Sequence, residues 1–219
     1  MKSPLKVRIF SIIGIAALLL GCWPGALLAQ APPEGEGQFA LPRLSGPQKS
    51  TLLLIAREAV DAALEGRASR EATVDARLQM PQPLVISIYV DGKLRSRAWR
   101  LKPAQPLYID ARSVTEEAID EPRDGGAPLG ADELARAKIG LAVLSGYMRV
   151  ADDRGVPPRS AVVVLSGFTE ALGLPGDVKS NAAADLLTFA CERAGLRPNI
   201  WLLPQTAVFY AQADGTQER

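Results

Sequence analysis

The sequence predicts one α+β domain with mainly antiparallel strands, and two observations support this fold class. Residues 84–101 carry the strongest β-hairpin pattern of the chain, with Asp91-Gly92 between two strand-like runs. Around this hairpin, helical and strand-like patterns follow each other in irregular order, unlike the strict strand–helix alternation that builds parallel sheets. The chain has 219 residues, 47% apolar and 22% charged, which suffices for one domain with a hydrophobic core.

Residues 1–29 are expected to form an export signal. Three basic residues, Lys2, Lys6 and Arg8, precede an uncharged apolar run at 9–20 that has signal-peptide length and is too short to span a bilayer alone. We therefore expect a protein exported across the cytoplasmic membrane, either periplasmic or membrane-anchored, that contacts the membrane only through this signal or a lipid anchor.

The processing of the signal has three alternatives. Leu19-Leu20-Gly21-Cys22 resembles a lipobox, in which Cys22 is acylated and becomes the new N-terminus. Cleavage after Ala29 is the second alternative, because Ala29-Gln30-Ala31 resembles an A-x-A cleavage site but Pro32 would block cleavage after Ala31. The third is a retained anchor formed by residues 9–29, which are just long enough to cross a bilayer.

The domain is expected at residues 48–213, between two polar segments. Residues 30–47 are rich in Pro, Gly and Glu without apolar periodicity, which is typical of a tether. Ser45 and Pro47, at the end of this tether, indicate the start of a helix. Residues 214–219 are expected to form a polar C-terminal tail.

Three principal helices and several strands are expected within the domain. Apolar residues recur every three or four positions in the segments 48–65, 106–120 and 181–194, which predicts amphipathic helices. Besides the two strands of the hairpin, β-branched and apolar runs predict strands at 138–144, 160–165 and 206–212.

The composition excludes several classes of function. The chain has no histidine, so Ser-His-Asp and Cys-His catalytic systems and His-ligated metals cannot form. Cys22 lies in the signal, and the remaining Cys191 alone makes neither a disulfide nor a cysteine zinc site, so a core role is expected for it. The sequence also lacks phosphate-binding loops and serine-hydrolase motifs. We expect no catalytic residue, no metal and no cofactor.

Nucleic acid is not an expected partner. The whole chain has 25 basic and 24 acidic residues, and three of the basic ones belong to the signal. The exported part is therefore slightly acidic and has no surplus of positive charge to bind a phosphate backbone.

The order of several short motifs resembles the AMMECR domain family. Residues 53–60 resemble the family's first helix, 83–95 its strand–Gly–Leu-Arg hairpin, and Glu121-Pro122-Arg123 its Asp-Pro-Arg loop. Residues 186–196, followed by Trp201, resemble its closing segment. The resemblance covers about residues 48–213 and implies an α+β fold of two subdomains around a cleft.

The chain departs from the family's most recognisable motif, Leu-Arg-Gly-Cys-Ile-Gly. The corresponding residues are LRSRAW at 94–99, so Arg97 occupies the position of the cysteine, while Ser96 and Trp99 occupy those of the glycines. A guanidinium cannot act as the thiolate nucleophile that the family's cysteine would supply. The resemblance therefore implies that a reaction depending on this thiol is not performed here.

Four residues are candidates for a ligand site: Arg95, Ser96, Arg97 and Arg123. Strand alternation places Arg95 and Arg97 on one face, where two guanidinium groups could hold a carboxylate or phosphate, and the resemblance implies that Arg123 lies nearby. The alternative is that these arginines face water or pair with acidic residues.

The leading functional hypothesis is an exported, non-catalytic, AMMECR-like binding or interaction module that holds a small anionic molecule or an unknown protein partner. One alternative is an enzyme of unknown reaction with a cleft rebuilt around Arg95 and Arg97, acting by positioning and electrostatics. A second alternative is a structural envelope protein without a small ligand.

Overall fold

The computed structural model of the chain describes residues 40–41, 43–70, 72–180 and 182–218. The predicted export signal, Cys22 and most of the predicted tether lie outside the described residues. Within the described part, no helix has the length and apolar character needed to cross a membrane.

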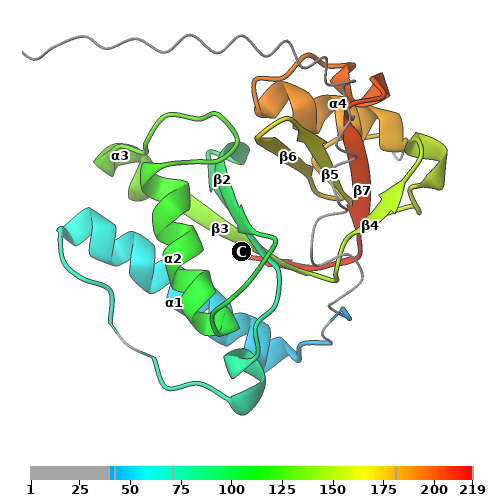
Figure 1. Cartoon of the computed structure of the whole chain (residues 1–219). Helices are drawn as coiled ribbons and strands as arrows, with labels where there is room; N and C mark the ends of the chain where they lie inside the picture. Colours follow the sequence, from blue (N-terminus) through cyan, green and yellow to red (C-terminus); the bar gives the residue numbers. More distant parts are fainter. Residues whose placement is uncertain (1–39, 42, 71, 181, 219) are drawn as a thin grey trace, which may run out of the picture. The chain divides into compact units, whose positions relative to one another are not determined.

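The described part of the chain contains eight strands and three helices longer than one turn (Figure 1). The helices are α1 (Gly46–Glu65), α2 (Leu107–Asp120), the single-turn α3 (Ala131–Leu134) and α4 (Ala183–Arg193). The strands are β1 (Leu84–Val90), β2 (Lys93–Arg100), β3 (Ala137–Leu144), β4 (Met148–Val150), β5 (Ala161–Ser166), β6 (Thr169–Gly173), β7 (Ala207–Ala211) and β8 (Ala213–Gln217). Short 3-10 turns are η1 (Ala76–Gln79), η2 (Asp153–Gly155) and η3 (Ile200–Leu202).

The strands form two antiparallel sheets, which confirms the predicted α+β class. Sheet A has the strand order β2-β1-β3-β8, and sheet B has the order β4-β7-β5-β6. The predicted hairpin is β1–β2, and its turn has the positive φ angles of a type I′ turn, 52° at Asp91 and 75° at Gly92.

Local sequence also explains the boundaries of α1. Ser45 caps the helix and forms a capping box with Gln48, and a proline occupies the first turn. At the other end Gly66 has a left-handed φ of 66°, and its N–H caps the carbonyls of the last turn.

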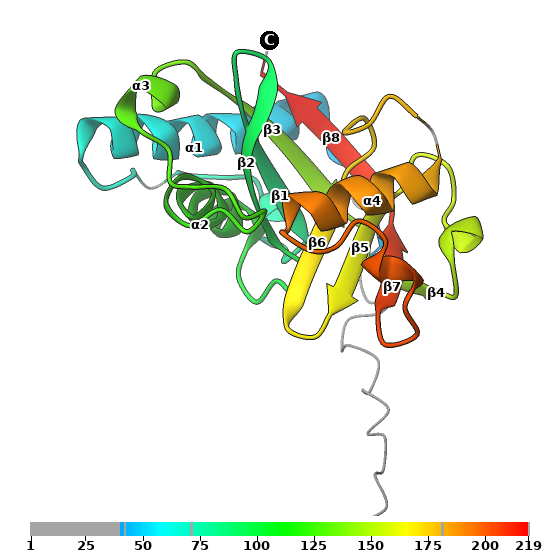
Figure 2. The ribbon, with the colours of Figure 1, turned by 90° about the horizontal axis from the view of Figure 1, so that it is seen from above.

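The elements pack in successive layers (Figures 1 and 2). Helices α1 and α2 cover one face of sheet A, and their shared core includes Leu52, Ile86 and Val114. The other face of sheet A packs against sheet B through a second core that contains Trp99 and Phe209. Helix α4 covers the opposite face of sheet B with a third core.

Three strands were not expected from the sequence: β4, β6 and β8. The last of these corrects the predicted polar tail, because residues 214–217 pair with β3 and complete the edge of sheet A. The β8 sequence ADGTQ lacks the alternation of a strand, so its conformation comes from pairing with β3 rather than from its own residues.

Candidate functional site

The most unusual side chain of the described part is Arg97, a charged residue that is only 1% exposed. It lies on the face of sheet A that is turned towards sheet B. Its Nε donates a hydrogen bond to Ser87 Oγ on β1 at 2.8 Å, and its two terminal nitrogens bind both carboxylate oxygens of Asp177 at 2.6 and 2.7 Å. This is the bidentate geometry in which an arginine–carboxylate pair is strongest.

Asp177 belongs to the loop that follows β6, so the pair joins the two sheets. One of its oxygens also accepts a hydrogen bond from the N–H of Leu174 at 2.7 Å, which fixes the turn at residues 174–177. Arg97 further approaches the carbonyl oxygen of Leu172 at 3.5 Å. The side chain of Arg97 therefore links β2 to the β6–α4 loop.

The pair keeps Arg97 charged inside the protein. Burial alone lowers the pKa of the guanidinium, but the hydrogen bonds and the negative charge of Asp177 outweigh burial and raise this pKa above its ordinary value. A buried charge of this kind is tolerated only because its partner and its hydrogen bonds compensate for the lost hydration.

Ser96 lies on the opposite face of the same strand. It pairs with Ile88 of β1, a member of the core beneath α1 and α2, and it is fully buried. Its Oγ has no hydrogen-bond partner among the described residues. Ser96 and Arg97 therefore face different layers and do not belong to one site.

The expectation that Arg95 and Arg97 share a face is corrected by a β-bulge. Ile88 pairs with Ser96 and Tyr89 pairs with Leu94, so Arg95 has no opposite residue on β1 and the simple alternation is interrupted. The guanidinium of Arg95 binds Glu133 of α3, with Nε 2.5 Å from Oε1, and this hydrogen bond lowers the pKa of the Glu133 carboxyl.

Arg123 lies beside β2. Its N–H donates to the carbonyl oxygen of Arg97 at 2.9 Å. Its side chain is 3.4 Å from Glu117 of α2 and 3.9 Å from Glu170 of β6. The three predicted arginines thus each face a carboxylate, as in the alternative interpretation of the sequence.

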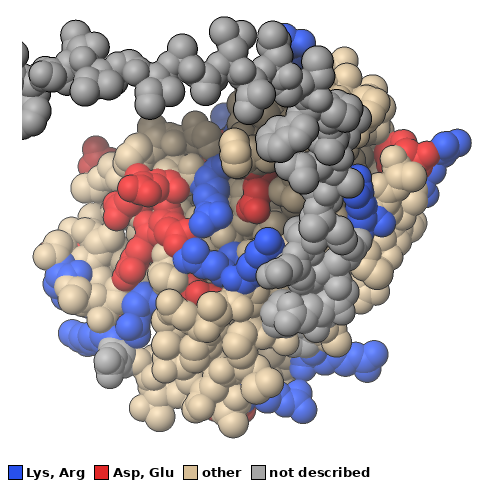
Figure 3. All heavy atoms as spheres, viewed as in Figure 1, with Lys and Arg blue, Asp and Glu red and all other residues tan. Residues whose placement is uncertain are grey.

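These ion pairs form part of a larger charged region around β2. Arg100 pairs with Glu117, and Arg193 of α4 pairs with the buried Asp124. Figure 3 shows acidic and basic side chains mixed on this face of the molecule rather than a field of one sign. The positive and negative charges of this region are therefore close to balanced, and the region does not attract anions in general.

A hollow that we call the central pocket lies beside the Arg97–Asp177 pair. It has a volume of about 380 Å³. Its floor is the sheet A face of β1, β3 and β8, where small residues leave space, and the loop 174–177 forms a wall. The lining side chains that offer hydrogen bonds are Ser87, Tyr89, Asp177, Thr216 and Gln217.

The ring of Tyr89 is set in this pocket by Gly140. A Cβ atom at Gly140 would stand 3.0 Å from Cε2 of Tyr89, so the glycine lets the ring lie close against β3. The Tyr89 hydroxyl has no hydrogen bond to any described residue. An aromatic wall and a phenol group are therefore available to a ligand on the sheet floor.

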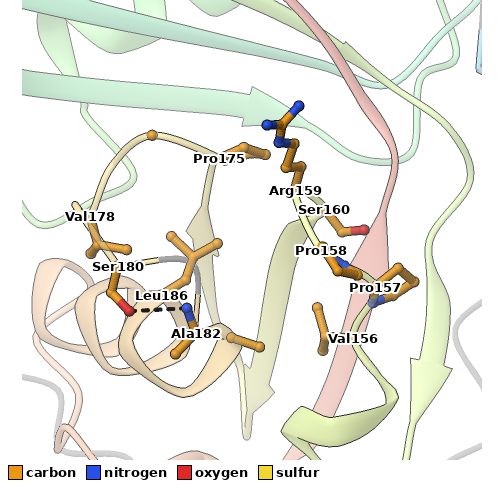
Figure 4. Close-up of a pocket in the computed structure, with 12 residues that line it drawn as sticks. Val156, Pro157, Pro158, Arg159, Ser160, Pro175, Val178, Ser180, Ala182 and Leu186 are labelled. Atoms are coloured by element: carbon orange, nitrogen blue, oxygen red, sulfur yellow. Dashed lines mark hydrogen bonds between the residues drawn. The ribbon is translucent and has the colours of Figure 1, made fainter.

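A second hollow, which we call the α4 pocket, lies on the other side of the loop 174–177 (Figure 4). It has a volume of about 280 Å³ and shares only Pro175 and Gly176 with the central pocket. The segment 156–160 before β5 forms one wall, and the start of α4 forms another. Of the predicted site residues, none lines either pocket.

Sequence patterns gave no sign of these two pockets. Their lining residues come from segments far apart in the chain, such as Ser87 with Thr216, and none forms a known motif. Cys191 lies in neither pocket. It is buried in the core under α4, and burial raises the pKa of its thiol to about 11, so the thiol is neutral and unreactive at physiological pH.

Comparison with known proteins gives the fold but no name for the function. No protein-family model matches the chain. No curated protein matches it in sequence. Among solved structures, it is similar to an uncharacterized protein, PH0010, from Pyrococcus horikoshii, with a TM-score of 0.67 and 19% identity, over 80% of this chain and 94% of that one. At this identity the likeness shows a shared fold alone.

Proposed function

We propose that the protein is an exported, non-catalytic binding module with an AMMECR-like domain, and that the central pocket is its ligand site. One observation supports this more than any other. Arg97, at the position of the family's cysteine, is buried and fully engaged with Ser87 and Asp177. The pocket beside it thus has walls that can hold a molecule, but neither a thiol nor a histidine that could attack one.

The chemistry of the pocket favours a small polar molecule. Asp177 is the acidic residue of the lining, and its charge is balanced by Arg97. Tyr89, Thr216 and Gln217 supply donors and acceptors, while Leu174 and Pro175 supply apolar contact. A polar molecule with one flat face fits the sheet floor better than a highly charged one.

A pocket-filling variant tests this proposal. Gly215 lies on the floor, and a Cβ atom there would meet its nearest neighbours, Leu141 and Ala142, at an ordinary 3.6 to 3.9 Å. Gly215→Leu is therefore expected to fold and to occupy the pocket. Gly46→Leu is the matched control, because a Cβ at that exposed position has no neighbour within 4 Å.

The experiment uses the full-length chain purified in a neutral detergent and exposed to small-molecule extracts of the cell envelope. Native mass spectrometry is expected to show a small molecule retained by the unmodified chain and by Gly46→Leu, but not by Gly215→Leu. Retention by Gly215→Leu would contradict the assignment of the pocket. Chemical conversion of the retained molecule would favour the enzyme alternative, and the absence of any retained molecule would favour a structural envelope protein.

Export itself is tested separately. Growth with a palmitate analogue, followed by detection of the label on the chain and on Cys22→Ala, separates lipidation from the two other forms of processing. Label that depends on Cys22 would identify a lipid-anchored protein. An unlabelled chain whose N-terminus begins at residue 30 would identify cleavage after Ala29.

A further inference from the structure

We propose that the α4 pocket binds a small oxyanion, a phosphate or a carboxylate, that carries a short apolar group. This inference goes beyond the proposed function, since the two pockets are lined by different residues apart from Pro175 and Gly176. It assigns the anionic ligand expected from the sequence to a place that the sequence did not indicate.

Arg159 supplies the positive charge. Arg159 is exposed and lines the pocket. Unlike Arg95, Arg97 and Arg123, it forms no ion pair with any described residue. Figure 4 shows this guanidinium at the rim beside Pro175. An arginine without a carboxylate partner at the edge of a cavity retains its full capacity for bidentate contact with an oxyanion.

Ser160 adds a hydroxyl group to the pocket. It lines the pocket and is only 6% exposed, and its hydroxyl forms no hydrogen bond with any described residue. Ser160 directly precedes β5, whose residues Val162 and Val164 pack in the core under α4. Solvent reaches this hydroxyl, which can therefore donate a hydrogen bond to an oxyanion that enters the pocket.

The start of α4 adds donors to the same pocket. The helix has 11 residues, and its N-cap residue, Ala182, provides no side-chain hydrogen bond. Ser180 instead accepts the N–H of Ala182 at 3.0 Å, so the following N–H groups of the first turn have no helical acceptor. These groups and the helix dipole favour a negative charge, although Asp185 in the first turn offsets part of this effect.

The remaining walls are apolar, so they favour a ligand that carries an apolar group besides the oxyanion. A volume of about 280 Å³ exceeds what a single oxyanion fills, because one water molecule takes roughly 30 Å³ in the liquid. The apolar lining residues are Val156, Pro157, Pro158, Val178 and Leu186. A short alkyl or comparable group attached to the oxyanion would cover them.

The test measures binding of defined probes to the full-length chain in a neutral detergent by isothermal titration calorimetry. The probes are inorganic phosphate, hexyl phosphate and hexanol, which separate the charged part of the ligand from the apolar part. Hexyl phosphate is expected to bind most tightly, phosphate more weakly and hexanol weakest. If neither phosphate nor hexyl phosphate binds, the proposal is wrong.

Variants at the rim give the decisive comparison. Arg159→Gly removes the guanidinium and suits the left-handed φ of 61° at this position, so the variant is expected to fold at least as stably as the unmodified chain. It should bind hexyl phosphate at least about tenfold more weakly. Ser160→Ala should also weaken binding, and Arg159→Lys, which keeps the charge, should retain more affinity than Arg159→Gly.

Two controls make the outcome specific. Arg197→Ala removes another exposed arginine, which lies beyond the C-terminal end of α4, and should leave binding unchanged. Gly215→Leu, which fills the central pocket, should also bind hexyl phosphate normally, so that failure of one site is distinguished from failure of the other. Equal affinity of Arg159→Gly and the unmodified chain would overturn the proposal.

A further pair of probes distinguishes the two possible sources of the oxyanion, a lipid headgroup and a free small molecule. Dihexanoyl phosphatidylglycerol, used below its micelle concentration, represents an anionic lipid headgroup, and dihexanoyl phosphatidylcholine is its uncharged control. Tighter binding of the phosphatidylglycerol than of hexyl phosphate would identify a lipid as the ligand. The reverse order would identify a free phosphorylated or carboxylated small molecule.

Discussion

Arg97 is a charged residue that joins two layers of the fold. Its cationic side chain reaches across to Asp177 and holds the β6–α4 loop. Trp99, two residues further along β2, fills the core between the two sheets, and its Nε1 donates to Glu170 at 3.1 Å. Both side chains add contacts between the layers, so this part of β2 stabilises the fold.

Arg97→Met tests this structural role. Removing the guanidinium leaves the carboxylate of Asp177 buried without its counter-charge, which should lower the free energy of unfolding by about 3 to 5 kcal/mol. The double variant Arg97→Met, Asp177→Asn should recover a large part of this loss, because the charge left behind is also removed. Denaturant unfolding of the full-length chain measures both values, and a single variant as stable as the unmodified chain would contradict the role.

The partner of Arg97 could not be predicted from the sequence. Arg97 and Asp177 are 80 positions apart, and Asp177 lies in a loop without any motif. The residue type and its neighbours on the strand are visible in the sequence, but the burial of a charge depends on a contact that only the folded chain creates. The same holds for Arg95, since the bulge that separates it from Arg97 leaves no pattern in the sequence.

At the scale of elements, the sequence predicts those with strong local determinants. The β1–β2 hairpin follows from Asp91-Gly92, and α1 follows from its capping box and apolar face. By contrast, β6 and β8 have weak strand sequences, and their conformation depends on pairing with β5 and β3. Their identification requires knowing which strands lie beside them.

The contact between β6 and α4 depends on a glycine. A Cβ atom at Gly173 would stand 2.9 Å from Cδ1 of Leu186 and 3.1 Å from its backbone oxygen. Gly173→Ala should therefore push α4 away from sheet B and lower the free energy of unfolding by about 1 to 3 kcal/mol. Thermal or denaturant unfolding measures the change.

Gly46→Ala is the matched control for this prediction. A Cβ atom there has no neighbour within 4 Å, and alanine is a better residue than glycine in a helix. The control should be neutral or slightly stabilising. If both variants had the same stability, close packing at Gly173 would not be important for the position of α4.

At the scale of the whole described domain, the chain returns to sheet A only at its end. After sheet B and α4 are complete, β8 pairs with β3, and the N–H of Glu218 donates to the carbonyl oxygen of Ile139 at 2.9 Å. The Glu218 carboxylate accepts from the N–H of Ile139 at 2.9 Å and from Nε of Arg57 at 3.0 Å. The last residues thereby join both strand β3 and helix α1, and β8 also supplies part of the floor of the central pocket.

Deleting residues 213–219 tests whether this segment is a strand or a tail. The deletion removes five cross-strand positions and the contacts of Glu218, which at about 0.5 to 1.5 kcal/mol per hydrogen bond amounts to several kcal/mol. The Tm should fall by roughly 10 °C or more, and the exposed edge of β3 should promote association, visible by light scattering. A chain that lacks only Arg219 serves as the control and should unfold like the full-length chain. A truncated chain with unchanged Tm would mean that residues 213–218 contribute nothing to sheet A in solution, and it would remove one side of the central pocket from the proposal.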